Sequence, residues 1–204
     1  LDGTITVNAG GDGLQANNDE DATKGTVSIE GGTLVITAAL DGIQAETMMA
    51  INDGTITISS GGGSNGRIVD SAKGLKAGVD ITIAGGTIQV DAADDAVHSN
   101  GSITISGSDL LLASGDDGVH ADAALLINGS DLTIAQSYEG LESSIIVIND
   151  GTINLVASDD GINVAGGSDG SGMMGPGQDS FSSSGDKYLE INGGLIAIYA
   201  GGDS

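Results

Sequence analysis

A phrase of about 22 residues recurs along this chain, and it constrains the fold more than any other feature. Each copy has an acidic residue followed by a small, an aliphatic, a polar and another small residue. The small second residue is Ala96, Gly118, Gly140 and Gly161, evenly spaced along the chain, with earlier copies at Gly13, Gly42 and Gly74. A fixed period of this size is typical of repeat folds whose units cannot each bury a core. The sequence therefore predicts one elongated body of stacked repeats.

Each period divides into three segments in which apolar residues alternate with polar ones, as in strands with one buried face. Turns such as Asn149-Asp150-Gly151 separate them. Stacking at about 4.8 Å would pair each backbone group with the repeats on either side. We therefore expect an all-β, right-handed parallel β-helix of about eight coils of ~22 residues, with three short strands per coil. A β-sandwich is a distant alternative, because hairpins would not need a fixed period.

The repetition is unbroken enough to predict a single β-helix domain over residues 1–204. Surface-loop insertions are expected at about 17–24, 59–70 and 168–186, where Gly, Ser and Asn interrupt the alternation. The 36 glycines and single proline suit many short strands joined by tight turns.

The formal charge of −24, with only five Lys and Arg, argues against nucleic acid as a partner. Membrane insertion is not expected either, because no apolar run reaches the roughly 18 or more residues that span a bilayer. The absence of cysteine excludes a disulfide framework and a thiolate metal site. Acidity of this degree suggests a calcium-rich exterior, so a secreted or cell-surface location is expected.

Acidic residues gather at the anchor of each repeat, and stacking would bring them into columns one strand spacing apart. Neighbouring carboxylates raise one another's pKa or recruit a cation, and an oxygen-rich cage suits Ca²⁺. Turn preference explains one Asp per turn but not doubled acids. The predicted calcium ligands are Asp94, Asp95, Asp116, Asp117, Asp122, Glu139, Glu142, Asp159, Asp160 and Asn163.

Other metals fit this pattern less well. Magnesium requires tighter octahedral geometry, and zinc would need more His or Cys than His98 and His120 offer. We interpret these two histidines as polar surface residues that share an outward column. Lys73 and Lys76 replace the acidic pattern near Gly74, which argues against a cation site there.

Three segments carry a resemblance to a known family: Gly115–Asp122, Ser137–Glu142 and Ser158–Asn163. With Met173–Gln178, they resemble the bacterial extracellular carbohydrate-binding proteins of polysaccharide-lyase-like β-helix topology. The resemblance implies bound calcium, a secreted or cell-surface location, and binding to pectin-like or cellulose-like glycans without demonstrated catalysis.

Three functions remain open from the sequence. A glycan-binding module with four aromatic residues would use hydroxyl hydrogen bonds, or calcium bridges to uronate carboxylates. A self-assembling surface fibre would stack head to tail through incomplete terminal coils, making the chain its own partner. A polysaccharide lyase would need a base beside a cation, and no convincing base is evident. We expect calcium-dependent polysaccharide binding without catalysis.

Overall fold

A computed structural model describes residues 3–21, 23–66, 71–165 and 186–201, and its secondary structure there consists of strands and turns. Eighteen strands form a single sheet in which every assigned pairing is parallel. Within these ranges the search for a helix able to cross a membrane found none. The sequence-based expectation of an all-β chain is therefore confirmed.

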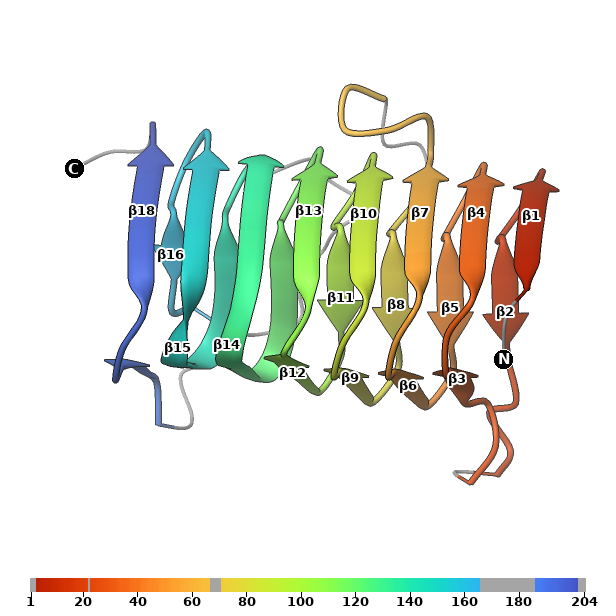
Figure 1. Ribbon diagram of the computed structural model, residues 1–204, viewed down its shortest axis with the longest axis horizontal. Coiled ribbons are helices and arrows are strands. Elements are labelled where there is room, and N and C mark those ends of the chain that lie inside the picture. Colours follow the sequence, from red (N-terminus) through yellow and green to blue (C-terminus); the bar gives the residue numbers. More distant parts are fainter. Residues whose placement is uncertain (1–2, 22, 67–70, 166–185, 202–204) are drawn as a thin grey trace.

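The strands fall into three groups that occupy different sides of the molecule (Figure 1). The first comprises β3 (Val27–Ile29), β6 (Met48–Ile51), β9 (Asp80–Ile83), β12 (Ser102–Ser106) and β17 (Tyr188–Ile191). The second comprises β1 (Thr4–Ala9), β4 (Thr33–Ala38), β7 (Thr55–Ser60), β10 (Thr87–Ala92), β13 (Asp109–Ser114) and β18 (Leu195–Ala200). The third comprises β2 (Leu14–Ala16), β5 (Ile43–Ala45), β8 (Leu75–Ala77), β11 (Val97–Ser99) and β16 (Ile162–Asn163). Two long strands, β14 (Val119–Gln136) and β15 (Leu141–Ala157), pass through all three sides.

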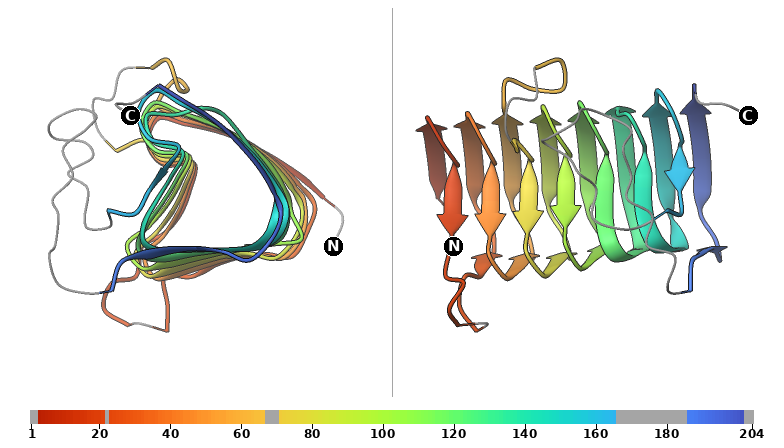
Figure 2. Two further views of the ribbon diagram at one scale, coloured as in Figure 1. Left: turned by 90° about the vertical axis from the view of Figure 1, so that its left-hand side faces the viewer. Right: turned by 180° about the vertical axis from the view of Figure 1, so that it is seen from behind.

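Viewed along the long axis, successive passes of the chain superpose on a three-sided outline with one indented side (Figure 2). Each strand pairs with its counterpart in the next pass. In the second group, Thr87 pairs with Asp109 and Asp109 with Asp131, so each step advances by one period of the repeated phrase. The offset is larger elsewhere: Thr4 pairs with Thr33, and Thr152 pairs with Leu195.

These pairings correct the predicted right-handed parallel β-helix of about eight coils of ~22 residues with three short strands each. The strands belong to one continuous 18-stranded parallel sheet, and the passes are unequal in length. The 18 residues of β14 and the 17 residues of β15 run without a break where three short strands were expected. The reason is that backbone pairing continues around the corners, with only local shifts of register between Ala121 and Ala124 and near Asn128.

Aliphatic side chains from all three sides fill the interior, as the alternation predicts. Ile88, Leu110 and Leu132 form one such column, and each is at most 1% exposed. Burying one side chain of this size contributes about 1.5–3 kcal/mol relative to leaving it in water.

The second residue of the repeated phrase is small for a different reason, which is the close packing of neighbouring passes. A Cβ on Gly118 would lie 2.6 Å from the carbonyl oxygen of Gly140 and 2.5 Å from Cδ1 of Ile134. Glycine there lets neighbouring passes approach.

The segments predicted as insertions are only partly described. Residues 17–26 lie between β2 and β3, as expected for the first. The second begins later than predicted, because Ser59 and Ser60 complete β7. Nearly all of the third, 168–185, lies outside the described residues. The assignment of the whole chain to one domain stays a prediction.

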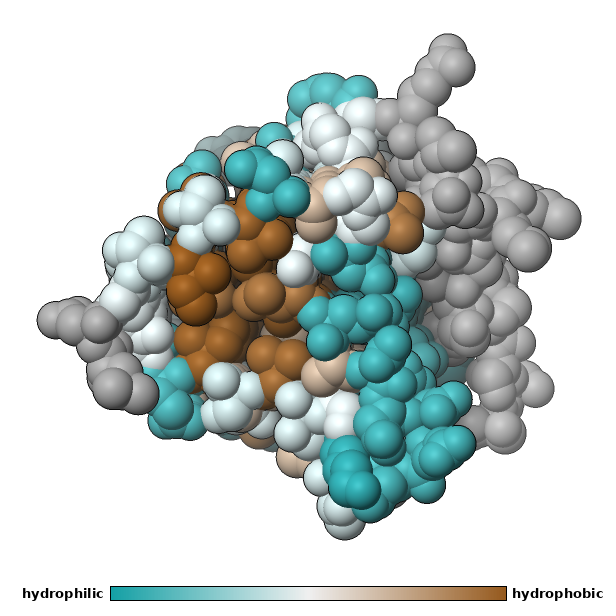
Figure 3. Space-filling view, turned by 90° about the vertical axis from the view of Figure 1, so that its right-hand side faces the viewer, coloured by the Kyte–Doolittle hydropathy of each residue, from teal (hydrophilic) through white to brown (hydrophobic). Residues whose placement is uncertain are grey.

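The end of the sheet at β1 exposes part of the aliphatic interior (Figure 3). Ile5 is 52% exposed and, with Leu14, Val27 and Leu34, it borders a hollow of about 320 Å³. Self-association through such ends stays a prediction.

Candidate metal centre

Two adjacent columns of side chains on the indented side contain the charged residues of the repeated phrase. We refer to these two columns, together with Asp94 and Asp116, as the charged row. The strand register places one column on β5, β8, β11, β14, β15 and β16, and the other three positions earlier in the chain. The first column is Gln44, Lys76, His98, His120, Glu142 and Asn163; the second is Asp41, Lys73, Asp95, Asp117, Glu139 and Asp160.

Backbone hydrogen bonds fix the spacing of the second column. The carbonyl oxygens of Asp95, Asp117 and Glu139 each accept a bond, at 2.9 Å, from the amide of the small residue in the preceding pass. The acidic side chains are thus held one strand spacing apart by the same ladder that holds the sheet together. Their proximity is a consequence of the fold.

Lysines balance the acidic charge at the N-terminal end of the charged row. Lys73 Nζ lies 2.5 Å from Asp95 Oδ2 and 3.1 Å from Asp94 Oδ2, and all three side chains are buried. Lys76 Nζ lies 2.9 Å from Asp41 Oδ2. Burial acts to raise the pKa of Asp95, but the charge of Lys73 and the contact with His98 outweigh it and hold that pKa well below its usual range. An ammonium group already sits among these carboxylates.

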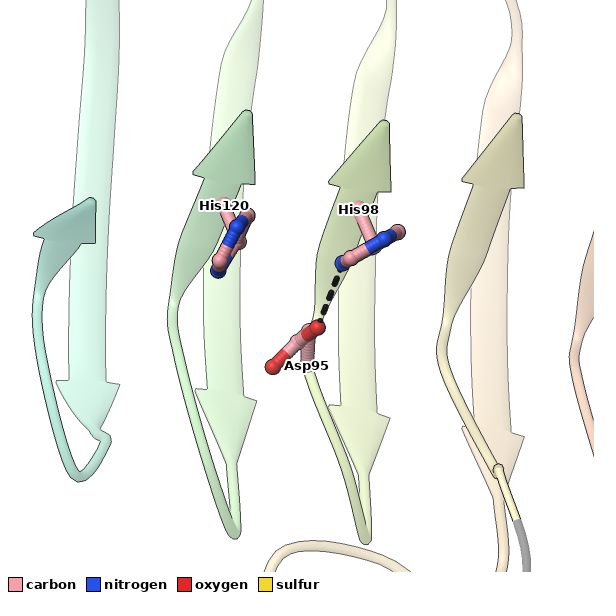
Figure 4. A group of neighbouring side chains, drawn as sticks. All are labelled: Asp95, His98 and His120. Carbon is pink, nitrogen blue, oxygen red and sulfur yellow. Dashed lines mark hydrogen bonds and ion pairs between the residues drawn. The ribbon is translucent and has the colours of Figure 1, made fainter. Parts of the chain in front are cut away.

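The two histidines occupy the middle of the charged row, on neighbouring strands (Figure 4). Their ring centroids are 5.0 Å apart. His98 Nδ1 lies 2.8 Å from Asp95 Oδ2, and His98 is 5% exposed while His120 is fully buried. The interpretation of both as polar surface residues is therefore wrong. His98 lies between the core residues Val97 and Ser99, so it is on the opposite face of its strand, and strand alternation alone did not indicate that this face is buried.

His120 is surrounded by carboxylates. Its Nδ1 lies 3.1 Å from both Asp117 Oδ2 and Glu142 Oε2, and its Nε2 lies 3.2 Å from Asp122 Oδ1. Burial acts to lower its pKa, but the hydrogen bonds to these three acids outweigh burial and raise the pKa far above the usual range. Burial also raises the pKa of Asp117, assisted by the charges of Asp95 and Asp116. Neighbouring acids contribute to both shifts, by hydrogen bonds that raise the pKa of His120 and by repulsion that adds to burial at Asp117.

The ten predicted ligands do not form one site. Three groups of ligand atoms lie within 4.8 Å of one another: Asp94, Asp95 and Asp116; Asp95, His98 and His120; and Asp117, His120 and Glu142.

The other predicted ligands lie around these groups. Asp122 contacts His120, and Asn163 Nδ2 donates to both carboxylate oxygens of Glu139 at 2.9 Å. Asp159 is half-buried and Asp160 is exposed, so Asp160 is the least enclosed of the ten.

Within the described residues, acids outnumber bases in this row. Its buried side chains include seven carboxylates, one lysine and two histidines. The seven are Asp41, Asp94, Asp95, Asp116, Asp117, Glu139 and Glu142. Buried carboxylates require compensation by a base, a proton or a metal ion. The lysines lie at the N-terminal end, so the part from Asp116 to Glu142 has the more suitable donor set for a cation.

Sequence reasoning missed the bases that contact these acids. Lys73, Lys76 and Asp41 were not among the predicted ligands, and Lys73 was read only as a departure from the acidic pattern. The signal was present in the register, because Lys73 stands one period before Asp95 and occupies the same column. Replacement of an acid by a lysine in a stacked column places the new cation directly beside the next acid.

Comparison with known proteins gives one match. A family model described as "Carbohydrate-binding domain-containing protein" matches residues 1–118, which is more than half of the chain. This range includes β1 to β13 and the charged row as far as Asp117. No curated protein and no solved structure matches the chain. The chain belongs to the family of carbohydrate-binding domain-containing proteins.

Proposed function

We propose that this protein is a non-catalytic, extracellular polysaccharide-binding module, stabilised by calcium held in its charged row. The observation that carries the proposal is the family match over residues 1–118, which supports carbohydrate as the ligand. The buried acids support the calcium part. The net charge of −24 suits a calcium-rich exterior, where binding modules work with modest calcium affinity.

The donor chemistry favours one part of the row for calcium. Among Asp94 and Asp95, the ammonium of Lys73 already supplies the positive charge. From Asp116 onward, the donors are Asp116, Asp117, Glu139 and Glu142, with Asp122, Asp159, Asp160 and Asn163 nearby along the chain. Carboxylate and amide oxygens are the ligands that Ca²⁺ prefers. We propose that the ion is held by Asp117 and Glu142, whose carboxylate oxygens lie together beside His120, with the other acids around them, and that His120 releases its proton when the ion binds.

The burial of the proposed ligands supports a structural role for this calcium. Asp116, Asp117, Glu139 and Glu142 are each at most 7% exposed, so a polymer carboxylate cannot share an ion that they enclose. The calcium bridge to a uronate that the sequence left open is therefore not part of the proposal. Glycan recognition then depends on hydroxyl hydrogen bonds at another surface.

The same burial supports a non-catalytic role. A lyase base must reach the sugar in its neutral form, whereas Lys73 and Lys76 are both ion-paired with carboxylates. A hydrolase needs two accessible carboxyl groups on either side of a glycosidic bond. The acids at the centre of the row, Asp94 and Asp95, are 0% exposed.

Three measurements test the proposal. Isothermal titration calorimetry of the EDTA-treated protein should show calcium binding, and the observed enthalpy should vary with the ionisation enthalpy of the buffer because His120 releases a proton. Affinity electrophoresis in gels containing soluble polysaccharides should show retardation of the protein by at least one polymer. Prolonged incubation should yield no new reducing ends and no unsaturated uronates. Retardation by none of the polymers would refute polysaccharide binding, and new chain ends would refute the non-catalytic role.

The location has its own test. Protease added to intact cells that produce the protein should remove it, while a cytoplasmic marker survives. Protection of the protein until the cells are lysed would contradict the extracellular assignment.

A further inference from the structure

The strands β10 and β13 and the last third of β14 lie side by side on one side of the molecule (Figure 1). Their outward surface is mainly polar, with Leu111 as its large apolar side chain. The inward residues of these strands, such as Leu110 and Leu112, are buried in the core. The outward residues form three rows across the strands. They are Thr87, Asp109 and Asp131; Gln89, Leu111 and Thr133; and Asp91, Ala113 and, after a shift of register, Gln136.

Two depressions lie at the two ends of these strands. The first, of about 500 Å³, is lined by Thr87, Asp109 and Asp131 and by Gly86, Gly107 and Gly129, which have no side chains to fill it.

The second depression, of about 250 Å³, lies at the other end of β10 and β13 and is lined by Gln89, Leu111, Ala135 and Ser64. Ser64 comes from the segment after β7, and its amide donates to Asp91 Oδ1 at 2.7 Å. Its carbonyl oxygen accepts a bond of 3.1 Å from Gln136. The wall of this depression is therefore fastened to the sheet.

Leu111 lies between the two depressions. It lies in the middle row, on the central strand, and is 43% exposed although it is surrounded by polar side chains. The 6 residues of β13 separate the two ends, a distance of about 20 Å at ~3.3 Å per residue. The surface thus offers a polar groove, an apolar contact and a second groove along one line.

Asp109 and Asp131 are placed for binding and not for stability. They lie directly opposite one another on paired strands, where like charges destabilise a sheet. Among the hydrogen bonds and ion pairs identified for the described residues, none involves either carboxylate. Ionised carboxylates are pure acceptors with two oxygens each, which suits the paired hydroxyl donors of a sugar.

We infer that this surface, from the groove at Asp109 and Asp131 to the groove at Ser64, is the polysaccharide-binding site, and that its ligand is an uncharged glycan lying along the strands. The inference rests on the proposed polysaccharide-binding function and assigns it a place and a ligand class. Sugar hydroxyls donate to the two carboxylates, and the apolar face of a ring packs on Leu111. A polyuronate is excluded by repulsion, because it would bring carboxylates against Asp109 and Asp131 on a chain of net charge −24.

The test uses the full chain in affinity gels containing either hydroxyethyl cellulose, a neutral polymer, or polygalacturonate. The double variant Asp109→Asn and Asp131→Asn should bind the neutral polymer about tenfold more weakly or worse, because two charged acceptors are lost. Leu111→Asn should weaken binding too. The matched control is Asp19→Asn with Glu20→Gln, which removes two exposed acids elsewhere and should bind like the parent protein. Melting temperatures confirm that each variant is folded.

The outcomes separate the two proposals. If the parent protein binds hydroxyethyl cellulose and the Asp109/Asp131 variant binds it equally well, the assigned surface is wrong while polysaccharide binding stands. Tighter binding of polygalacturonate than of the neutral polymer, with EDTA present, would overturn the ligand class. If the parent protein binds neither polymer, the proposed function fails, and the assigned surface fails with it.

Discussion

Lys73 Nζ lies 2.5 Å from Asp95 Oδ2, although the two residues are 22 positions apart and their side chains are 4% and 0% exposed. The register of the sheet alone brings them together, because they occupy one column in successive passes. In the sequence Lys73 looks like a break in the acidic pattern. The contact shows that it is the counterion of the acids in that pattern. It also explains why the charged row has an N-terminal part balanced by lysine and a C-terminal part rich in acids.

Replacing Lys73 with Met should lower the free energy of unfolding by about 3–5 kcal/mol, because Asp94 and Asp95 would remain buried without this cation. Urea denaturation in EDTA measures the change. The control is Lys24→Met, which breaks an exposed pair with Asp21 and should change stability far less. Equal effects of the two substitutions would show that the buried pair contributes no more to stability than the exposed pair.

Calcium removal should lower the melting temperature, and restoring calcium should recover it, because the ion offsets repulsion among buried carboxylates. In the variant Asp117→Asn with Glu142→Gln, two proposed ligands lose their charge, so the calcium-dependent rise should be largely lost. The Asp19→Asn, Glu20→Gln protein should keep it. Differential scanning calorimetry with and without calcium provides the comparison, and an undiminished rise in the first variant would refute the assigned ligands.

Stability should depend on pH through His120. Its folded pKa is raised above the unfolded value of 6.5, so the contribution of the imidazolium is fully present below that pH. The contribution is lost as the pH rises from 6.5 toward the folded pKa. In EDTA, the parent protein should therefore exceed His120→Gln in stability most at about pH 5.5 and less at about pH 8.5. Urea midpoints at both values measure this, and a difference that grows with pH would contradict the assignment.

A side chain at position 118, the small residue of one repeat, should destabilise the fold. In Gly118→Ala, the new Cβ would meet the backbone oxygen of Gly140 at 2.6 Å, so neighbouring passes must separate. We expect a loss of about 1–3 kcal/mol, as for other overpacked sites. Gly10→Ala is the control, because a Cβ there meets nothing within 4 Å. Thermal unfolding of both variants decides the matter, and equal melting temperatures would show that the close approach relaxes freely.

The sequence predicted the strand content well because alternation is a local property. The pairs Ile88/Val90 and Leu110/Leu112 face the core as the period-two pattern required. It failed on strand length, since β14 and β15 continue around corners where turn residues such as Asn149-Asp150-Gly151 suggested an end. Whether a corner interrupts pairing depends on the neighbouring pass, which local sequence does not contain.

The candidate site, too, was predicted from the sequence only in part. The repeat placed Asp94, Asp95 and Asp116 close together, and the structure brings them within 4.8 Å. It did not reveal that His98 and His120 are buried, because alternation identifies which residues share a face but not whether that face is covered.

The sequence by itself determined the columns: which residues stack, which are apolar and which are acidic, since these follow from the period and the chemistry of each residue. Only the tertiary structure decided which groups surround each column and whether its side chains are buried. The charged row is buried in the folded chain, and its burial makes counterions and protons necessary there. On the outer surface of β13 the side chains are instead exposed. Asp109 and Leu111 lie there beside hollows that no neighbouring strand fills. Burial depends on the path of the whole chain, and burial separates a structural carboxylate from one free to bind a ligand.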